Sequence, residues 1–123
     1  MTNKTTPDKF DSQLMRGSLD LMVLAILDRE AQYGYSIQQK LREASGEKVD
    51  LKAGTLYPIL HRLEAEKLIR SKWDESSARK RKWYELTKTG RKRLQQQAQT
   101  WHAYVHCIQS LLPPKLALTL PAP

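Results

Sequence analysis

Residues 53–67, with the sequence AGTLYPILHRLEAEK, decide how this chain is interpreted. Apolar side chains recur there at the i, i+3, i+4, i+7 spacing that places them on one face of an α-helix. That apolar face consists of Leu56, Ile59, Leu60 and Leu63. The other face carries the polar side chains of Lys52, Thr55 and Arg62. We therefore predict an amphipathic helix with its apolar face on a core and its polar face free to meet a partner.

The elements on both sides of this helix follow a known order. Apolar residues at helical spacing predict helices over residues 13–29 and 35–44, with a turn at residues 32–35 between them. Residues 68–72 and 83–86 predict two strands joined by a polar and basic link. Three helices followed by a hairpin with a basic tip form the plan of a winged helix-turn-helix, whose third helix enters the major groove of DNA. The predicted fold is therefore mainly α with a small β-hairpin.

A long C-terminal helix is predicted after the hairpin. Thr87 or Thr89 starts it, and Pro113-Pro114 stops it. Apolar positions at alternating steps of four and three residues give it a heptad rhythm. The resulting seam consists of Leu94, Ala98, Trp101, Val105, Ile108 and Leu112. The seam could pack on its own domain, but a helix of this length overhangs a small winged helix. We therefore predict that it forms a homodimer.

These elements divide the chain into four segments. Residues 1–12 are polar and are interpreted as a flexible N-terminal arm. Residues 13–87 are predicted to form the winged helix-turn-helix DNA-binding domain. Residues 88–112 are predicted to form the C-terminal dimerisation helix, and residues 113–123 a flexible tail.

The basic residues are concentrated in one part of the chain. The net charge is +8 over 123 residues, and ten Lys or Arg against three acidic residues between Arg70 and Leu94 supply +7 of it. A concentrated positive patch attracts a phosphate backbone. The surplus therefore indicates an anionic partner, either a nucleic acid or a membrane surface.

The candidate DNA-binding residues lie on the predicted third helix, on the hairpin tip and at the start of the second helix. They are Tyr33, Lys52, Thr55, Tyr57, Arg62, Arg79, Lys80, Arg81 and Lys82. Lys and Arg bind phosphates or guanine edges, while Thr and Tyr hydroxyls donate to phosphates. Simpler interpretations stay open, namely a solvated helix face, a solubilising loop and a packing role for Tyr33. Four consecutive cations at residues 79–82 repel one another unless an anion lies near, which favours DNA binding.

Three segments together resemble the PadR family of bacterial regulators. Residues 33–37, YGYSI, are similar to the opening of the family's second helix, and residues 54–64, GTLYPILHRLE, to its recognition helix. Residues 68–69 and 79–90, the latter RKRKWYELTKTG, resemble its wing. The chain resembles the short type, which lacks a second helical domain. The resemblance implies a homodimeric repressor that binds a palindromic operator in double-stranded DNA and releases it on a stimulus, often a small molecule.

Trp101 suggests what that small molecule is. It lies fourteen residues after Thr87 in the seam of the C-terminal helix. This spacing is similar to a multidrug-responsive member of the family, in which one Trp from each subunit sandwiches flat aromatic compounds at the dimer centre. The resemblance implies that Trp101 binds an aromatic effector, although Trp101 could equally fill a core position.

Catalysis and metal binding find little support in the sequence. His102 and His106 lie four residues apart beside Cys107, but no acidic residue lies near them in sequence, and a metal site needs three or four converging ligands. We predict no metal and no cofactor. The sequence has no Ser, His and acid grouping in a recognisable context, no Gly-rich phosphate loop and no Cys pair. We therefore predict that the chain is not an enzyme.

The expected location follows from the cysteine content and the apolar runs. A single cysteine, Cys107, forms no disulfide within the chain, which suits a reducing compartment. The first residues lack the apolar centre of a secretory signal, and the longest apolar run, residues 21–27, is too short to span a bilayer. We expect a cytoplasmic, nucleoid-associated protein.

Two alternative functions remain at this point. A winged helix can serve as a protein–protein interaction module, in which the third helix and the wing bind an acidic protein without sequence-specific DNA binding. A basic protein can also lie on a membrane surface, but that needs a long helix with one cationic and one apolar face. The C-terminal helix has its cations, Arg91, Lys92 and Arg93, only at its start, so we expect no membrane partner.

Overall fold

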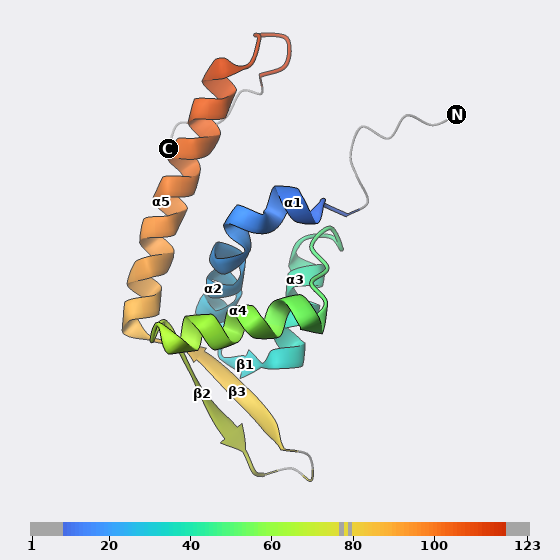
Figure 1. Ribbon diagram of the computed structural model, residues 1–123, viewed down its shortest axis with the longest axis vertical. Coiled ribbons are helices and arrows are strands. Elements are labelled where there is room, and N and C mark those ends of the chain that lie inside the picture. The colour runs from blue at the N-terminus through green and yellow to red at the C-terminus, as the bar shows by residue number, and fades with distance from the viewer. Residues whose placement is uncertain (1–8, 77, 79, 118–123) are drawn as a thin grey trace, which may run out of the picture.

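The computed structural model describes residues 9–76, 78 and 80–117. Its elements in chain order (Figure 1) are α1 (Ser12–Met15), the 3-10 helix η1 (Arg16–Ser18), α2 (Leu19–Arg29), β1 (Gln32–Tyr33), α3 (Gly34–Ala44), α4 (Ala53–Ala65), β2 (Ile69–Asp74), β3 (Arg81–Leu86) and α5 (Lys88–Leu111). Helices dominate, and the strands form one small antiparallel sheet. This confirms the predicted fold, a winged helix with a hairpin and a long C-terminal helix.

The single helix predicted over residues 13–29 is wrong, because the structure breaks it into α1, η1 and α2. The break falls at Gly17 and Ser18, two residue types with weak helix propensity. The Ser18 hydroxyl donates to the Met15 carbonyl at 3.1 Å, and the Ser18 backbone leaves the helical region at φ −123°. As a result α1 runs in a different direction from α2 (Figure 1).

The turn predicted at residues 32–35 contains a strand that the sequence analysis missed. β1 pairs antiparallel with β3, with Gln32 opposite Tyr84 and Tyr33 opposite Trp83. β3 also pairs antiparallel with β2, so the strand order is β1-β3-β2. A strand of two residues is too short to show alternation, which is why the sequence did not reveal it. Through β1 the hairpin is tied to the start of α3.

The hairpin is longer than predicted. The strands predicted over residues 68–72 and 83–86 extend to Asp74 and back to Arg81, and these two residues form the outermost registered pair. The hairpin projects beyond the helices as a wing (Figure 1). The described residues between the two strands, 75, 76, 78 and 80, lie at its tip.

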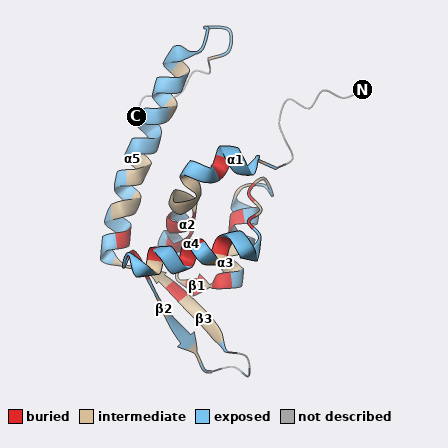
Figure 2. Cartoon of the chain, viewed as in Figure 1, coloured by how far each residue is buried: buried red, intermediate tan, exposed pale blue. Residues whose placement is uncertain are grey.

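The hydrophobic core lies between α2, α3, α4 and the sheet (Figure 2). The apolar face predicted for α4 is buried there, and its four residues are at most 7% exposed: Leu56, Ile59, Leu60 and Leu63. α2 adds Val23 and Leu24, and α3 adds Ile37, all with no exposed surface. The core therefore fixes which face of α4 points outward.

α5 starts from a tight junction with the core. The Thr87 hydroxyl oxygen accepts a hydrogen bond from the Gly90 amide at 3.0 Å and donates to the Lys67 or Leu68 carbonyl. A Cβ atom on Gly90 would lie 1.9 Å from the Leu68 carbonyl oxygen, so only glycine fits this approach. Beyond the junction α5 extends past the other helices (Figure 1).

The described parts of the predicted arm and tail make local contacts. The Phe10 amide donates to the Lys48 carbonyl at 2.9 Å, and the side chain of Phe10 packs against the core. After α5, the amides of Leu116 and Ala117 donate to the Pro113 carbonyl. Residues 1–8 and 118–123 lie outside the described residues, and the division into arm, domain, helix and tail stays a prediction.

Candidate nucleic-acid interface

The first turn of α4 is presented to solvent. Lys52 is its N-cap residue, and its side chain is 80% exposed. Gly54 and Thr55 are exposed as well, and no atom lies within 4 Å of where a Gly54 Cβ would stand. A helix N-terminus carries a partial positive charge and favours anions. The predicted contacts Lys52 and Thr55 therefore lie together where α4 can approach a phosphate or a base edge.

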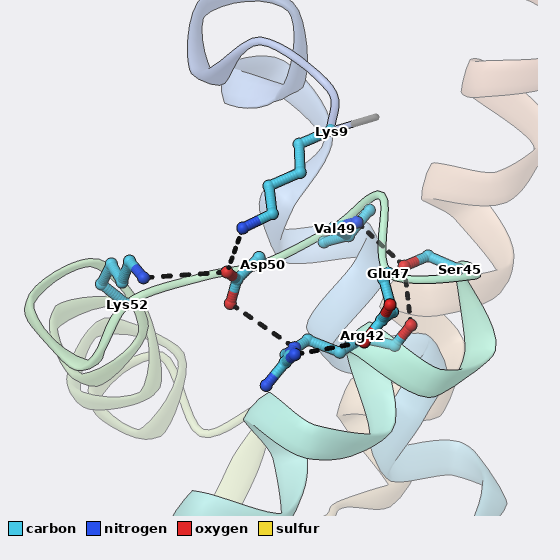
Figure 3. A network of polar contacts seen from close by, with 7 residues as sticks. All are labelled: Lys9, Arg42, Ser45, Glu47, Val49, Asp50 and Lys52. Carbon is cyan, nitrogen blue, oxygen red and sulfur yellow. Dashed lines mark hydrogen bonds and ion pairs between the residues drawn. The ribbon is translucent and has the colours of Figure 1, made fainter. Parts of the chain in front are cut away.

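Asp50 organises the turn that leads into α4. Its carboxylate lies 3.0 Å from Lys9 Nζ, 3.7 Å from Lys52 Nζ and 3.9 Å from Arg42 Nε, as Figure 3 shows. The hydrogen bond from Lys9 and the neighbouring cations lower the pKa of the Asp50 carboxyl below its ordinary value. Asp50 thus joins three parts of the chain: the segment before α1, the end of α3 and the start of α4.

Arg62 lies in an ion pair within the protein. Its two terminal nitrogens bind the two carboxylate oxygens of Asp20 at 2.6 and 2.8 Å, and Glu66 lies 3.5 Å away. The hydrogen bond to Asp20 raises the pKa of the Arg62 guanidinium. A bidentate pair between an arginine and a carboxylate is more directional and stronger than a single hydrogen bond between neutral groups. Arg62 therefore binds α4 to α2, seven residues and about two helical turns along α4 from Thr55.

Tyr57 has a packing role in addition to its exposed edge. Its ring lies against Gly34, where a Cβ would come within 2.7 Å of the Tyr57 hydroxyl oxygen. Tyr57 is half-buried and packs against the core. A larger residue at position 34 would have to displace the outer end of the Tyr57 ring.

The cations of the wing stack on aromatic rings. The Arg81 guanidinium lies 5.5 Å from the centre of the Tyr33 ring and 5.4 Å from that of Tyr35. Lys82 Nζ lies 5.4 Å from the centre of the Trp73 ring. Lys80 is exposed at the tip. Arg79, which the sequence analysis also singled out, lies outside the described residues.

A groove of about 380 Å³ lies between α4 and the wing, and residues at the start of α3 also line it. Lys80, Arg81 and Lys82 line it from the wing, and Tyr57 lines it from α4. None of the described residues that line it is acidic. His61 of α4 also lines the groove; in the sequence it was noted only within residues 54–64, the segment that resembles a recognition helix, and not as a site residue. The groove can accept an anionic chain.

The predicted seam of α5 is only partly covered. Leu94 packs against the core, while Trp101, Ile108 and Leu112 are 45%, 40% and 36% exposed. Ala98 and Val105 lie between these extremes. Three further apolar side chains, which the sequence analysis missed, are more exposed still: Leu14, Tyr104 and Leu111.

Two hollows flank Trp101 where α5 faces α1 and α2. One, of about 290 Å³, is lined by Leu14 and Ile108 among others, and the second, of about 330 Å³, by Leu21 and Gln97 among others. Trp101 and Tyr104 line both. The structure thus brings the predicted effector residue Trp101 to an apolar surface.

Within the part of the chain that the structure describes, no group of three or more His, Cys, Asp or Glu could hold a metal ion. No helix in that part is both long and apolar enough to cross a bilayer.

The helix order, the small sheet and the projecting basic wing define a winged-helix protein with a long C-terminal helix. The model of the Transcriptional regulator PadR-like family matches residues 23–96. The chain belongs to this family and is a transcriptional regulator, which implies that it acts by binding DNA. The family is one of regulators, not of enzymes.

Solved structures agree with this assignment. A transcriptional regulator from Clostridium thermocellum has a TM-score of 0.78 at 29% identity, over 83% of this chain and 100% of that one. A PadR family regulator from Eggerthella lenta has a TM-score of 0.73 at 34% identity, over 80% and 85%. An uncharacterised protein of Lysinibacillus sphaericus is 32% identical over 91 residues, which are 73% of this chain and 84% of that protein.

Proposed function

We propose that the chain is a repressor that binds a palindromic operator as a homodimer and is released by a small, flat aromatic effector. The observation that carries the DNA-binding part is the groove between α4 and the wing. Three consecutive wing cations line it and none of its described lining residues is acidic. Such a surface attracts a phosphate backbone.

α4 and the wing have different tasks in this proposal. α4 enters the major groove with its first turn, where Lys52 and Thr55 meet base edges or phosphates. The wing follows the backbone and binds phosphates through Lys80 and its neighbours, Arg79 included. Arg62 is left out of the proposed interface because Asp20 holds its guanidinium.

The proposed homodimer follows from the uncovered part of α5. Trp101, Tyr104 and Ile108 are 45%, 63% and 40% exposed on one chain, and contiguous apolar patches of this kind mark interaction sites. A second copy offers the same patch, so a two-fold axis covers both at once. Two recognition helices related by that axis require two inverted half-sites in the operator.

The proposed effector site lies around Trp101, at the same surface. A flat ring that stacks on the indole would separate α5 from α1 or from the partner subunit. Half-sites lie about 34 Å apart or a multiple of it, so a small change in the spacing of the two α4 helices lowers DNA affinity. By thermodynamic linkage, DNA must weaken effector binding by the same factor.

The salt dependence of DNA binding tests the proposal. We expect the affinity for a labelled duplex to fall steeply with salt, with a log–log slope of about −0.9 per phosphate contacted. Lys80→Ala should flatten that slope by about one unit, while Lys115→Ala, beyond α5, should leave it unchanged. A shallow slope, with tight binding to an acidic protein instead, would support the protein–protein module and refute the DNA-binding role.

A regulator of transcription works where DNA is accessible. We therefore also propose a cytoplasmic, nucleoid-associated location, which fluorescence microscopy of the tagged chain would test by its overlap with stained DNA.

A further inference from the structure

Two tyrosines from one short segment hold the outer end of the wing. The outermost pair of the hairpin is Asp74 with Arg81. The Tyr33 hydroxyl donates a hydrogen bond to the Asp74 carboxylate, and the Tyr35 hydroxyl accepts one from Arg81 Nη1 at 3.2 Å. Each strand of the wing is thus bound by a different tyrosine at the same level of the ladder.

The carboxylate of Asp74 is well suited to this hydrogen bond. It also accepts from the Ser76 hydroxyl at 2.5 Å and from the Ser76 amide at 2.9 Å. These bonds from Ser76, together with the one from Tyr33, lower the pKa of Asp74 to about 2. The same contact raises the pKa of the Tyr33 phenol. Near neutral pH the pair is therefore a neutral donor on a charged acceptor, which is stronger than a bond between two neutral groups.

The ring of Tyr33 is fixed by its neighbours. It stacks on Tyr35 with centres 5.9 Å apart and planes 7° apart, and it meets Trp83 edge-on at 4.8 Å. Arg81 lies over both tyrosine rings. A ring held on three sides presents its hydroxyl to Asp74 in one direction.

The side-chain contacts of Tyr33 and Tyr35 lie beyond the point where backbone pairing with β1 attaches the wing to the body. β1 pairs with β3 only at Tyr84 and Trp83. The outer pairs of the hairpin, Trp73 with Lys82 and Asp74 with Arg81, lie beyond β1 (Figure 1). The angle of the wing to α4 therefore depends on the side-chain contacts of Tyr33 and Tyr35.

We propose that Tyr33 is a positioning residue for the wing: through Asp74 it holds the hairpin at the angle to α4 at which the groove fits a DNA backbone strand. This inference rests on the proposed DNA-binding function and assigns the Tyr33 hydroxyl to Asp74 instead of to a phosphate. Arg81, which stacks on the same two rings, then faces the groove in an orientation that is fixed before DNA binds. A wing that is already in place loses less conformational entropy when it binds.

Tyr33→Phe removes only the hydroxyl and tests the proposal with a labelled random-sequence duplex. We expect the affinity to fall about tenfold or more, because a hydrogen bond to a charged group contributes at least about that factor. The salt slope should become shallower by about one unit, because a displaced wing loses a phosphate contact. A purely stabilising role would lower the melting temperature and leave the salt slope unchanged.

A double-mutant cycle with Asp74→Ala separates positioning from direct contact. If Tyr33 acts through Asp74, Tyr33→Phe has no further effect on affinity or slope in the Asp74→Ala background. The same loss in both backgrounds would mean that the hydroxyl binds phosphate itself and would overturn the proposal. No loss of affinity or slope in the parent background would overturn it as well.

Two controls complete the experiment. Ser110→Ala removes a hydroxyl that donates to the Cys107 carbonyl of its own helix, at an exposed position of α5 outside the proposed dimer and effector residues, and should leave affinity and slope unchanged. Tyr35→Phe removes the acceptor for Arg81 and should repeat the shallower slope. A parent protein that binds no duplex at low salt would refute the proposed DNA binding and this inference together, whereas a parent that binds while Tyr33→Phe behaves identically refutes the inference alone.

Discussion

The winged-helix body and α5 bury their residues very differently. α2, α3, α4 and the sheet supply most of the core, with Val23, Leu24 and Ile37 at 0% exposure. α5 is the longest helix described, at 24 residues, yet its one fully buried residue is Gly90 at the junction. The body can therefore fold around its own core, while the outer half of α5 has apolar side chains that one chain leaves uncovered. We infer that the body binds DNA and that α5 forms the interface with a second copy of the chain.

The largest effect on stability is expected at Gly90, where α5 joins the body. Gly90→Ala places a Cβ 1.9 Å from the Leu68 carbonyl oxygen and 2.7 Å from a Leu86 methyl, so the backbone has to move. We expect the free energy of unfolding to fall by about 3 kcal/mol or more. Urea denaturation followed by circular dichroism measures this.

Gly54→Ala is the matched control, since no atom lies within 4 Å of its Cβ position. Alanine is the better helix former, so stability should rise by up to about 1 kcal/mol. Equal effects of the two substitutions would refute the close packing of α5 on the body.

The outer half of α5 should respond to Ile108→Glu through association. Ile108 is 40% exposed on one chain, and a carboxylate there would be buried without a partner in the proposed dimer. The dimer dissociation constant should rise at least about tenfold, which is about 1.4 kcal/mol. Sedimentation at several concentrations measures the constant. Gln99→Glu adds the same charge at another exposed position of α5 and should change it little, and a parent that sediments as a monomer would refute the dimer.

Within the body, a substitution at Arg62 is expected to change stability, and one at Lys52 is expected to change DNA binding. Arg62→Ala removes the pair with Asp20 and should lower the free energy of unfolding by about 1 kcal/mol, since solvent screens a half-exposed pair. It should leave the salt slope of DNA binding unchanged. Lys52→Ala should flatten that slope by about one unit with little change in stability. The reverse pattern would return Arg62 to the DNA interface.

The smallest expected effect is the pH dependence of the Asp50 network. The folded-state pKa of Asp50 is below its unfolded value, so the carboxylate stabilises the fold above about pH 4, and this contribution is lost as the pH falls through the folded-state pKa. Asp50→Asn should therefore make the stability less dependent on pH in the acid range. An acid denaturation profile identical to that of the parent would show that the network does not stabilise the fold.

Local periodicity explains what could be predicted from the sequence. The stripe of α4 predicted its buried face correctly, because burial on a helix follows the spacing of neighbouring apolar residues. The long helix after Thr87 was predicted for the same reason, together with its Thr cap and the prolines that end it. The basic stretch indicated the wing because charge is read directly from the residues.

Contacts between distant segments explain what could not be predicted. Asp20 and Arg62 are 42 residues apart, and Tyr33 and Asp74 are 41 apart, so nothing near either residue in sequence indicates its partner. β1 exists only because β3 lies beside it. The polar surface of α4 could be predicted, but which of its cations is held by a carboxylate required the structure.

The central claim is that each body binds one half-site and that α5 joins two chains into a dimer. The most direct test is to select bound duplexes from a random pool of sequences. We predict that the enriched sequences share an inverted repeat whose half-sites are centred about one helical turn, or a multiple of it, apart. A single unrepeated site, or no enrichment from a pool that the protein does bind, would contradict it.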